Sequence, residues 1–358
     1  MDIELIVRIV FAKLDTVTIN TDLILSTIEK EGIFLKEIKI TDIEGIKIGN
    51  AQDVGGGTGC TVLIAPNGAP AGVDVRGGGP ASRESQLLNP VMSMTKIHAV
   101  LLSGGSAFGL DAAGGVMRFL EEKGIGFDVG VTKVPLVCAS CLFDLVVGDF
   151  RCRPDVDMAY KACMDAFENN SPEQGCVGAG TGATVGKVNG AESALKSGLG
   201  IYAEEVNGLK VGAVAAVNAF GDIFENGKQI SGAVNADKTA FLSTEEEMYK
   251  TVVPVRVEDR FSAGTNTTIC CVVTNARFNK AEMNKIAAMA QDGMSRAIRP
   301  VHTAMDGDTV YAMSTGSFAA DLNVVGTLAA RVLEKAIANA AKNAETMYGF
   351  TAAKDLDF

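Results

Sequence analysis

Residues 267–273, with the sequence TTICCVV, form a β-branched and apolar run that predicts a buried strand. Gly264, Thr265 and Asn266, directly before this run, are residues that favour turns. Two threonine hydroxyls therefore stand at the front edge of a strand, next to an asparagine. Local preference alone explains the arrangement, since threonine suits strands and asparagine suits turns. The alternative is a chemical role for the hydroxyls, which depends on the rest of the chain.

The other segments predict a layered α/β fold, with sheets inside and helices outside. We expect residues 1–36 to form an N-terminal extension, and the body of the fold to begin at about Glu37. Short apolar segments predict strands at 43–49, 60–66, 71–77, 98–105, 199–205, 209–218, 252–258 and 267–275. Segments with apolar residues at helical spacing predict helices at 83–96, 109–123, 155–168, 280–297 and 319–347.

The charge of the chain excludes some classes of partner. A net charge of −11, from 43 acidic and 32 basic side chains, opposes binding to nucleic acid and to anionic membranes. The N-terminus carries Asp2, Glu4 and Arg8, unlike a signal peptide, and no run of about 18 uncharged apolar residues occurs in the sequence. Most of the eight cysteines lie in apolar surroundings, which suits free thiols in a reducing compartment. We therefore expect a soluble, cytoplasmic protein.

The segment GAGTGATVGK, residues 178–187, has the glycine content of a phosphate-binding loop but not its pattern. A Walker motif requires glycine where this chain has Thr181, and serine or threonine where it has Val188. Val185 occupies the third glycine position of the dinucleotide fingerprint. We interpret the segment as a loop that packs closely or exposes backbone N–H groups, and we expect no nucleotide cofactor.

Other short motifs do not complete a site. Two Ser-x-x-Lys matches, at 93–96 and 193–196, lack the further elements that β-lactamase-like chemistry requires. A Ser-His-Asp triad would have to use His98 or His302; His98 opens an apolar strand and is interpreted as structural, whereas His302 stays open. The cysteines of the 138–141 segment supply half a zinc site, and no second pair follows at ligand spacing. We therefore expect neither a metal nor a cofactor.

The hydroxyl of Thr267 becomes a candidate nucleophile if the chain is cut before it. A nucleophilic hydroxyl needs a base, and the α-amine of an N-terminal threonine, with a pKa of about 8, suits that role near neutral pH. The bond between Asn266 and Thr267 is suited to such a cut. The threonine hydroxyl can attack the preceding carbonyl in an N-to-O acyl shift where a turn holds the bond under strain.

From residue 40 to its end, the chain resembles the self-cleaving aminopeptidases that include L-aminopeptidase/D-Ala-esterase/amidase and the β-peptidyl aminopeptidases. The matching blocks are 59–84, 98–127, GAGTGATVGK (178–187), VGAVAAVNAFGD (211–222), NTTICCVVTNA (266–276) and RAIRPVHTAMDGDTVYA (296–312). The resemblance implies an α/β fold of the four-layer αββα sandwich type, made as one precursor and processed into two subunits. Residues 37–266 would form the large subunit part, and residues 267–358 the small one.

The resemblance also implies a set of site residues. Asn266 and Thr267 match the self-cleavage bond, so that Thr267 would be both the new N-terminus and the nucleophile. Asn218 matches an asparagine whose side chain helps to form an oxyanion hole, in keeping with the value of an amide N–H aimed at a developing negative charge. Asp306 and Asp308 stand where β-peptidase members carry a Ser-x-Glu pair, and two carboxylates this close can raise each other's pKa.

One further position departs from the family pattern. Phe143 corresponds to a tyrosine that assists the oxyanion in some members, and a phenylalanine has no hydroxyl for that purpose. The substrate preference of those members therefore does not transfer to this chain on resemblance alone.

Three functions remain open on the sequence. The leading hypothesis is an aminopeptidase or amidase that removes N-terminal residues from short peptides, amides or esters through an acyl-Thr267 intermediate. The second is an acyltransferase, because ornithine acetyltransferases share this kind of fold and self-cleavage at a threonine. The third is a non-catalytic binding protein. The resemblance also implies a homo-oligomer, with a tetramer expected.

Overall fold

The computed structural model describes residues 35–252 and 266–358 of the 358-residue chain. The chain divides into two units, Met1–Lys36 and Glu37–Phe358, of which the second contains nearly all of the described residues. The expected extension at 1–36 and all but one residue of the expected strand at 252–258 fall outside the described residues.

The larger sheet has six strands in the order β1-β12-β13-β16-β18-β4. β16 runs antiparallel to β13 and parallel to β18, so the apolar run identified in the sequence lies inside the sheet with a partner on each side. The six strands are β1 (Lys36–Glu37), β4 (Ala71–Val75), β12 (Leu199–Val206), β13 (Leu209–Asn218), β16 (Thr267–Ala276) and β18 (Thr309–Phe318).

The second sheet has five strands in the order β2-β3-β6-β9-β5. These strands are β2 (Lys47–Asp53), β3 (Thr58–Ala69), β5 (Ala81–Arg83), β6 (Ile97–Ser103) and β9 (Val137–Cys141). Shorter strands pair in small ribbons: β7 (Phe127–Asp128) with β8 (Lys133–Val134), β10 (Thr184–Val185) with β11 (Leu195–Lys196), and β14 (Asp222–Glu225) with both β15 (Lys228–Ser231) and β17 (Ile298–Arg299).

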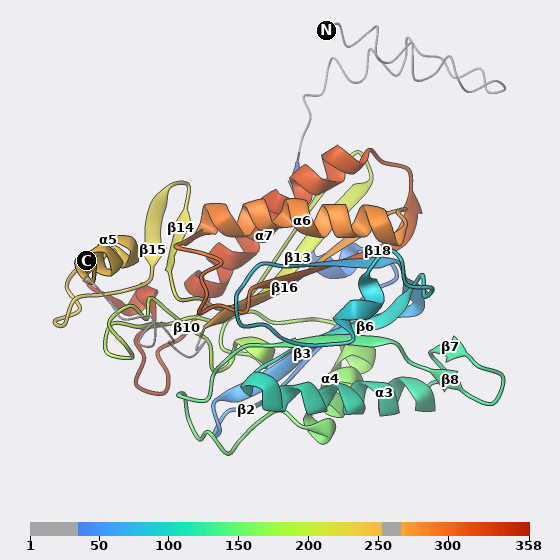
Figure 1. Ribbon diagram of the computed structural model, residues 1–358, viewed down its shortest axis with the longest axis horizontal. Helices are drawn as coiled ribbons and strands as arrows, with labels where there is room; N and C mark the ends of the chain where they lie inside the picture. The colour runs from blue at the N-terminus through green and yellow to red at the C-terminus, as the bar shows by residue number, and fades with distance from the viewer. Residues whose placement is uncertain (1–34, 253–265) are drawn as a thin grey trace, which may run out of the picture. The chain divides into compact units, whose positions relative to one another are not determined.

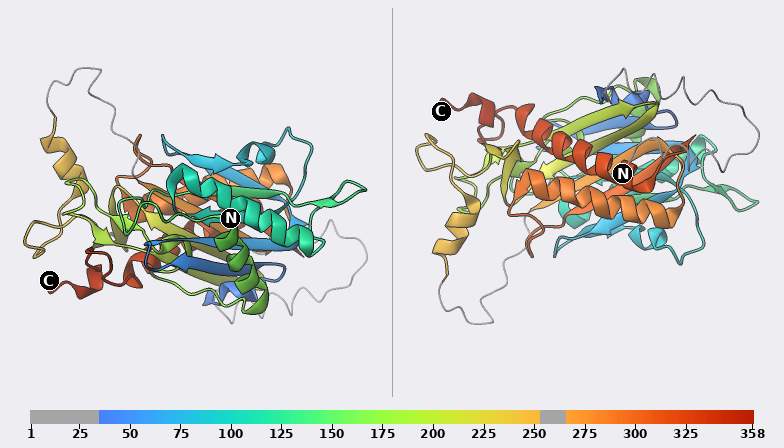
Figure 2. Two further views of the ribbon diagram at one scale, coloured as in Figure 1. Left: turned by 90° about the horizontal axis from the view of Figure 1, so that it is seen from below. Right: turned by 90° about the horizontal axis from the view of Figure 1, so that it is seen from above.

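Helices cover the outer faces of the two sheets (Figure 1). α6 (Lys280–Ala297) and α7 (Leu322–Lys342) lie side by side on the six-stranded sheet, as Figure 2 shows from above. α3 (Ala113–Glu122) and α4 (Val156–Glu168) pack on the five-stranded sheet, while the shorter α5 (Thr244–Lys250) belongs to neither pair. Within the described ranges, no helix has both the length and the apolar character needed to cross a membrane.

Three large apolar clusters form most of the core in the described part of the chain. One joins α6 and α7 to the six-stranded sheet, and another joins α3 and α4 to the five-stranded sheet. The third contains side chains of both sheets, such as Leu63 and Val100 from one and Val214 and Ile269 from the other. The expectation of a mixed α/β fold with sheets inside and helices outside is therefore confirmed.

The expected helix at 83–96 is wrong. The segment contains the end of β5 and a short 3-10 helix, Ser85–Leu88. Glu84 adopts a left-handed backbone conformation with φ of 57°, and Pro90 disfavours helical geometry at the residue before it, so a continuous helix cannot form. The strand β18 has no counterpart among the expected strands, because its second half, STGSF, lacks an apolar or alternating pattern.

Candidate active site

The strand directions bring the ends of three strands to one edge of the larger sheet. β16 and β18 are parallel, so both begin at this edge, whereas β13 is antiparallel to β16 and ends there. Thr267, the first residue of β16, is paired with Asn218, the last residue of β13. Asp306 and Asp308 come directly before β18. The structure therefore brings the four site residues expected from the sequence to the same edge.

Side-chain alternation directs Thr267 and Asn218 to the same face of the sheet. In β16, Ile269 and Cys271 belong to the cluster between the two sheets, whereas Cys270 packs in the cluster beneath α6 and α7. Thr267 follows the first set and Thr268 the second, as expected from the two-residue period of a strand. Thr267 is 4% exposed and Asn218 is fully buried, so any charge that develops between them is shielded from water.

Hydrogen bonds at both ends fix the amide of Asn218. Its Oδ1 accepts from the Thr184 backbone N–H at 3.1 Å and from Lys187 Nζ at 2.7 Å, and its Nδ2 donates to the Phe143 carbonyl at 2.8 Å. Because the first two partners are donors, they determine which end of the amide is oxygen. An amide nitrogen carries two hydrogens, so Nδ2 keeps a second N–H for another acceptor.

Thr184 and Lys187 are site residues that the sequence did not identify. Both belong to the glycine-rich 178–187 segment, which packs against Asn218 through the β10–β11 ribbon and its neighbours. Burial lowers the pKa of Lys187 to about 7, while the nearby carboxylates of Asp306 and Asp144 act in the opposite direction. The position of Lys187, at the end of a glycine-rich segment within a block that resembles the family, could have indicated a site residue. Its contact with Asn218, however, depends on the tertiary fold.

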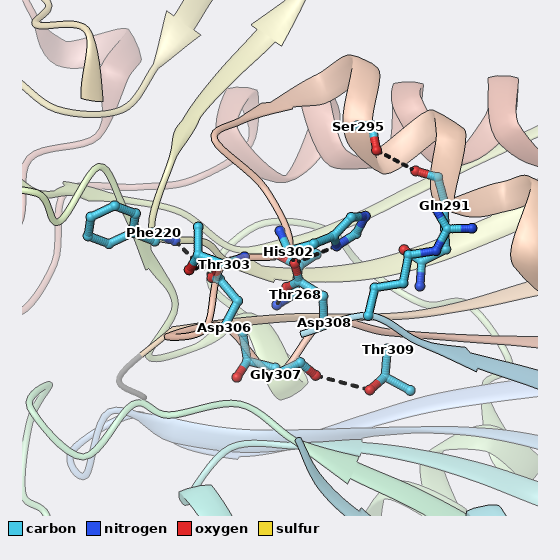
Figure 3. A network of polar contacts seen from close by, with 12 residues as sticks. Phe220, Thr268, Gln291, Ser295, His302, Thr303, Asp306, Gly307, Asp308 and Thr309 are labelled. Carbon is cyan, nitrogen blue, oxygen red and sulfur yellow. Dashed lines mark hydrogen bonds and ion pairs between the residues drawn. The ribbon is translucent and has the colours of Figure 1, made fainter. Parts of the chain in front are cut away.

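Asp306 is a buried carboxyl group held by a turn (Figure 3). Its Oδ2 accepts from Thr303 Oγ1 at 2.5 Å and from the Thr303 backbone N–H at 3.2 Å, and its Oδ1 accepts from the Phe220 N–H at 3.3 Å. Burial, together with the negative charge of Asp308, raises the pKa of Asp306 to about 6. The two carboxyl groups thus differ in environment although they are two residues apart.

Asp308 connects the start of β16 to His302 (Figure 3). Its Oδ1 accepts from the Thr268 N–H at 2.8 Å, and its Oδ2 accepts from the His302 backbone N–H at 3.0 Å. His302 Nδ1 lies 3.0 Å from the same Oδ2, within hydrogen-bond distance of this carboxyl oxygen. His302, which the sequence left open, is therefore a partner of Asp308.

The peptide bond before Thr267 lies against the turn that carries the two carboxyl groups. Thr267 Oγ1 donates to the Asn266 carbonyl oxygen, and the Gly307 N–H donates to the same oxygen at 3.2 Å. Asn266 is 2% exposed, so the bond between the two residues is buried. The Thr267 hydroxyl, the Asn266 carbonyl and a backbone N–H donor thus occupy one small region.

Residues of the short motifs that the sequence analysis rejected as sites have structural contacts. His98 Nδ1 accepts from the Leu136 N–H at 3.1 Å, and Ser193 Oγ donates to the Gly186 carbonyl at 3.0 Å, so both hold loops in place. Cys138 lies in the apolar cluster between the sheets. Across residues 35–252 and 266–358, no cluster of three or more histidine, cysteine or acidic residues is arranged to hold a metal ion.

Comparisons with known proteins agree on one family. The profile of peptidase family S58 matches residues 39–354. An uncharacterized aminopeptidase of Mycobacterium leprae is 40% identical over 78% of each chain. A 6-aminohexanoate-oligomer endohydrolase of Kocuria sp. is 30% identical over 84% of this chain and 85% of its own.

Solved structures agree on the fold. The L-aminopeptidase D-Ala-esterase/amidase of Ochrobactrum anthropi, described as a variant of the Ntn hydrolase fold, superposes with a TM-score of 0.66. The match covers 90% of this chain and 93% of the other at 16% identity. A β-aminopeptidase from Burkholderia sp. superposes with a TM-score of 0.59 over 88% and 89% of the two chains, at 16% identity. The chain therefore belongs to peptidase family S58 and is a hydrolase that acts on peptide bonds.

Proposed function

We propose that this protein is a self-processed aminopeptidase or amidase of the N-terminal-nucleophile type, with Thr267 as its nucleophile. The observation that carries the proposal is the position of Thr267 at a buried strand edge, opposite Asn218 and beside the Asp306–Asp308 turn, with its hydroxyl on the Asn266 carbonyl. The arrangement of the three apolar clusters supports the four-layer αββα form of the fold. Residues 37–266 and 267–358 would then be its two subunits.

Maturation proceeds by an N-to-O acyl shift. Thr267 Oγ1 attacks the carbonyl carbon of Asn266, and the carbonyl becomes an oxyanion. When this intermediate collapses, the C–N bond breaks, the nitrogen takes up the proton that the hydroxyl lost, and an ester joins Asn266 to the threonine side chain. Water then hydrolyses the ester, which leaves a carboxylate on Asn266 and a free α-amine and hydroxyl on Thr267.

Substrate hydrolysis repeats this chemistry with a second acyl group. The α-amine of Thr267 accepts the hydroxyl proton while Oγ1 attacks the substrate carbonyl, and the amide nitrogen leaves with a proton. The second N–H of Asn218 Nδ2 stabilises the oxyanion, and its direction is set by Thr184, Lys187 and Phe143. Water then releases the acyl group. Asp308 holds the start of β16 through the Thr268 N–H, which positions the nucleophile.

The names of the relatives support a class of substrate. They carry the names aminopeptidase and 6-aminohexanoate-oligomer endohydrolase, both of which describe the cleavage of amide bonds. We therefore propose short peptides and amides, including non-α amides, as substrates of this chain. The homo-oligomer, and the tetramer in particular, remains a prediction that light scattering of the purified protein tests directly.

The central test is substitution of the two threonines. Thr267→Ala is expected to give a folded chain of full length without activity, because neither the acyl shift nor hydrolysis has a nucleophile. Thr268→Ala is the matched control: its side chain points to the opposite face, and the chain should still be cut. Intact mass measurement reads out the cut, and release of amine from short peptide amides reads out activity. Normal cleavage before residue 267 in the Thr267→Ala protein would disprove the mechanism.

A further inference from the structure

The Asn266 carbonyl oxygen accepts a backbone hydrogen bond from a group other than the Asn218 amide that we propose for substrate hydrolysis. When Thr267 Oγ1 attacks, the oxygen that becomes negative is the carbonyl oxygen of Asn266. The Asn218 Nδ2 group donates to the Phe143 carbonyl, and no hydrogen bond from it to the Asn266 oxygen is present in the described structure. The Gly307 N–H donates to that oxygen at 3.2 Å.

We infer that the backbone N–H of Gly307 is the oxyanion donor for the self-cleavage step. This inference rests on the proposed self-processing at Asn266–Thr267 and assigns a specific group to it. Backbone donors are suited to such a role because they are fixed before the reaction and need no reorganisation when the charge develops. In the buried surroundings of Asn266 the interaction is shielded from water.

The turn around Gly307 holds this donor in place from both sides. The side chain of Asp306 is anchored by Thr303 and that of Asp308 by Thr268 and His302. The backbone carbonyl of Asp306 also accepts from the Gly79 N–H at 2.8 Å. The flanking carboxylates thus fix the peptide plane whose N–H faces the scissile carbonyl.

The absence of a side chain at residue 307 has a steric reason. A Cβ built on Gly307 would lie 2.7 Å from Thr267 Oγ1 and 2.8 Å from the Gly79 carbonyl oxygen, both closer than real Cβ contacts. Any other residue would displace the nucleophile or the loop beside it. The Asp-Gly-Asp sequence therefore combines two side-chain anchors with a central amide that can approach the reacting peptide.

The test replaces the amide N–H of Gly307 by an ester oxygen, through incorporation of glycolic acid at residue 307. This exchange removes the donor and adds no side chain. The matched control is glycolic acid at residue 79, which removes the Gly79 N–H that donates to the Asp306 carbonyl. An ester at 307 also makes the Asp306 carbonyl a weaker acceptor for the Gly79 N–H, and the control removes this same hydrogen bond while leaving the Gly307 donor in place. Self-cleavage of each protein is followed by intact mass over time.

We expect glycolic acid at 307 to slow self-cleavage by about 100-fold, the effect of removing one oxyanion donor, and the control at 79 to cut within a few-fold of the natural rate. Equal rates for the two esters would overturn the inference while leaving self-processing intact. An uncut natural chain would instead overturn the proposed function.

A second measurement does not depend on the folding of an ester variant. In uncut Thr267→Ala protein, the Asn266 carbonyl can be labelled with ¹³C and observed by infrared spectroscopy. A donor at Gly307 should hold its stretching band at the lower frequency of a hydrogen-bonded amide. A band at the frequency of a free amide carbonyl would contradict the assignment.

Discussion

Lys187 shows how a single residue escapes prediction from sequence. Thr267, Asn218, Asp306 and Asp308 are expected at the site from local pattern and family resemblance, and the strand directions bring them to one edge. Lys187 ends a glycine-rich segment that matches neither the Walker motif nor the dinucleotide fingerprint, so the sequence supports only a loop that packs closely or exposes backbone N–H groups. Its contact with Asn218 Oδ1 at 2.7 Å arises from tertiary packing of the β10–β11 region.

The predicted consequence is a loss of turnover in Lys187→Met. Methionine has a similar length but cannot donate to Asn218 Oδ1, so the amide loses one of the two donors that fix its orientation. Since the proposed role of this amide is to stabilise the oxyanion, we expect kcat to fall by about 10-fold or more while KM changes little. The comparison uses Lys250→Met, an exposed lysine of α5, as a control. A raised KM with an unchanged kcat would place Lys187 outside the reaction.

The buried charge of Lys187 also predicts a dependence of stability on pH. Burial lowers the pKa of Lys187 from 10.5 to about 7 in the folded protein. Between these values the unfolded chain binds one proton more than the folded chain, so the stability contributed at this residue rises with pH. In an uncut Thr267→Ala background, Lys187→Met should therefore stabilise most below pH 7, and the gain should shrink at higher pH. Urea unfolding at several pH values measures the difference in free energy of unfolding between the two proteins. A difference that grows with pH would contradict the lowered pKa of Lys187.

Among the elements, the helices α3 and α4 pack through a glycine pair. A Cβ on Gly115 would lie 1.9 Å from the Val156 carbonyl oxygen at the start of α4, whereas a Cβ on the adjacent Gly114 would have its nearest contact at 3.4 Å, with a Val156 side-chain carbon. The sequence predicts α3 and α4 from their apolar spacing, but it does not indicate which of the two glycines lies against the backbone of α4. The same limit explains why β18 escaped prediction, since its place is set by pairing with β16 and β4 rather than by its own residues.

The two glycines predict opposite effects of the same substitution. Gly114→Ala should raise the melting temperature, because alanine is favoured over glycine in a helix by about 1 kcal/mol. Gly115→Ala should lower it, because the added methyl group meets the α4 backbone, and overpacking of this kind costs about 1–3 kcal/mol. Thermal unfolding of the two variants beside the natural protein measures both effects. Two shifts of the same sign would show that the α3–α4 contact is looser than the structure indicates.

In the whole molecule, the segment after Thr267 contributes its two long strands, β16 and β18, to the interior of the six-stranded sheet. β16 lies between β13 and β18, and β18 in turn pairs with β4, so strands that precede Thr267 flank the two that begin at or after it. The buried Tyr311 of β18 shares a hydrogen bond of 2.8 Å with Ser140 of the five-stranded sheet. Sheet order of this kind depends on contacts between distant segments, which is why the sequence predicted seven of the eleven strands in the two large sheets but not their arrangement.

This arrangement of strands predicts that the piece ending at residue 266 and the piece 267–358 stay together after self-cleavage. Separating residues 267–358 from the rest would break the β13–β16 and β18–β4 ladders and expose their backbone groups together with the apolar face beneath α6 and α7. The cut removes one covalent bond at the strand edge and none of these contacts. We therefore expect two bands in denaturing electrophoresis but a single species containing both pieces in native chromatography, with no release at moderate urea concentrations. Elution of residues 267–358 alone under native conditions would mean that the sheet depends on the intact chain.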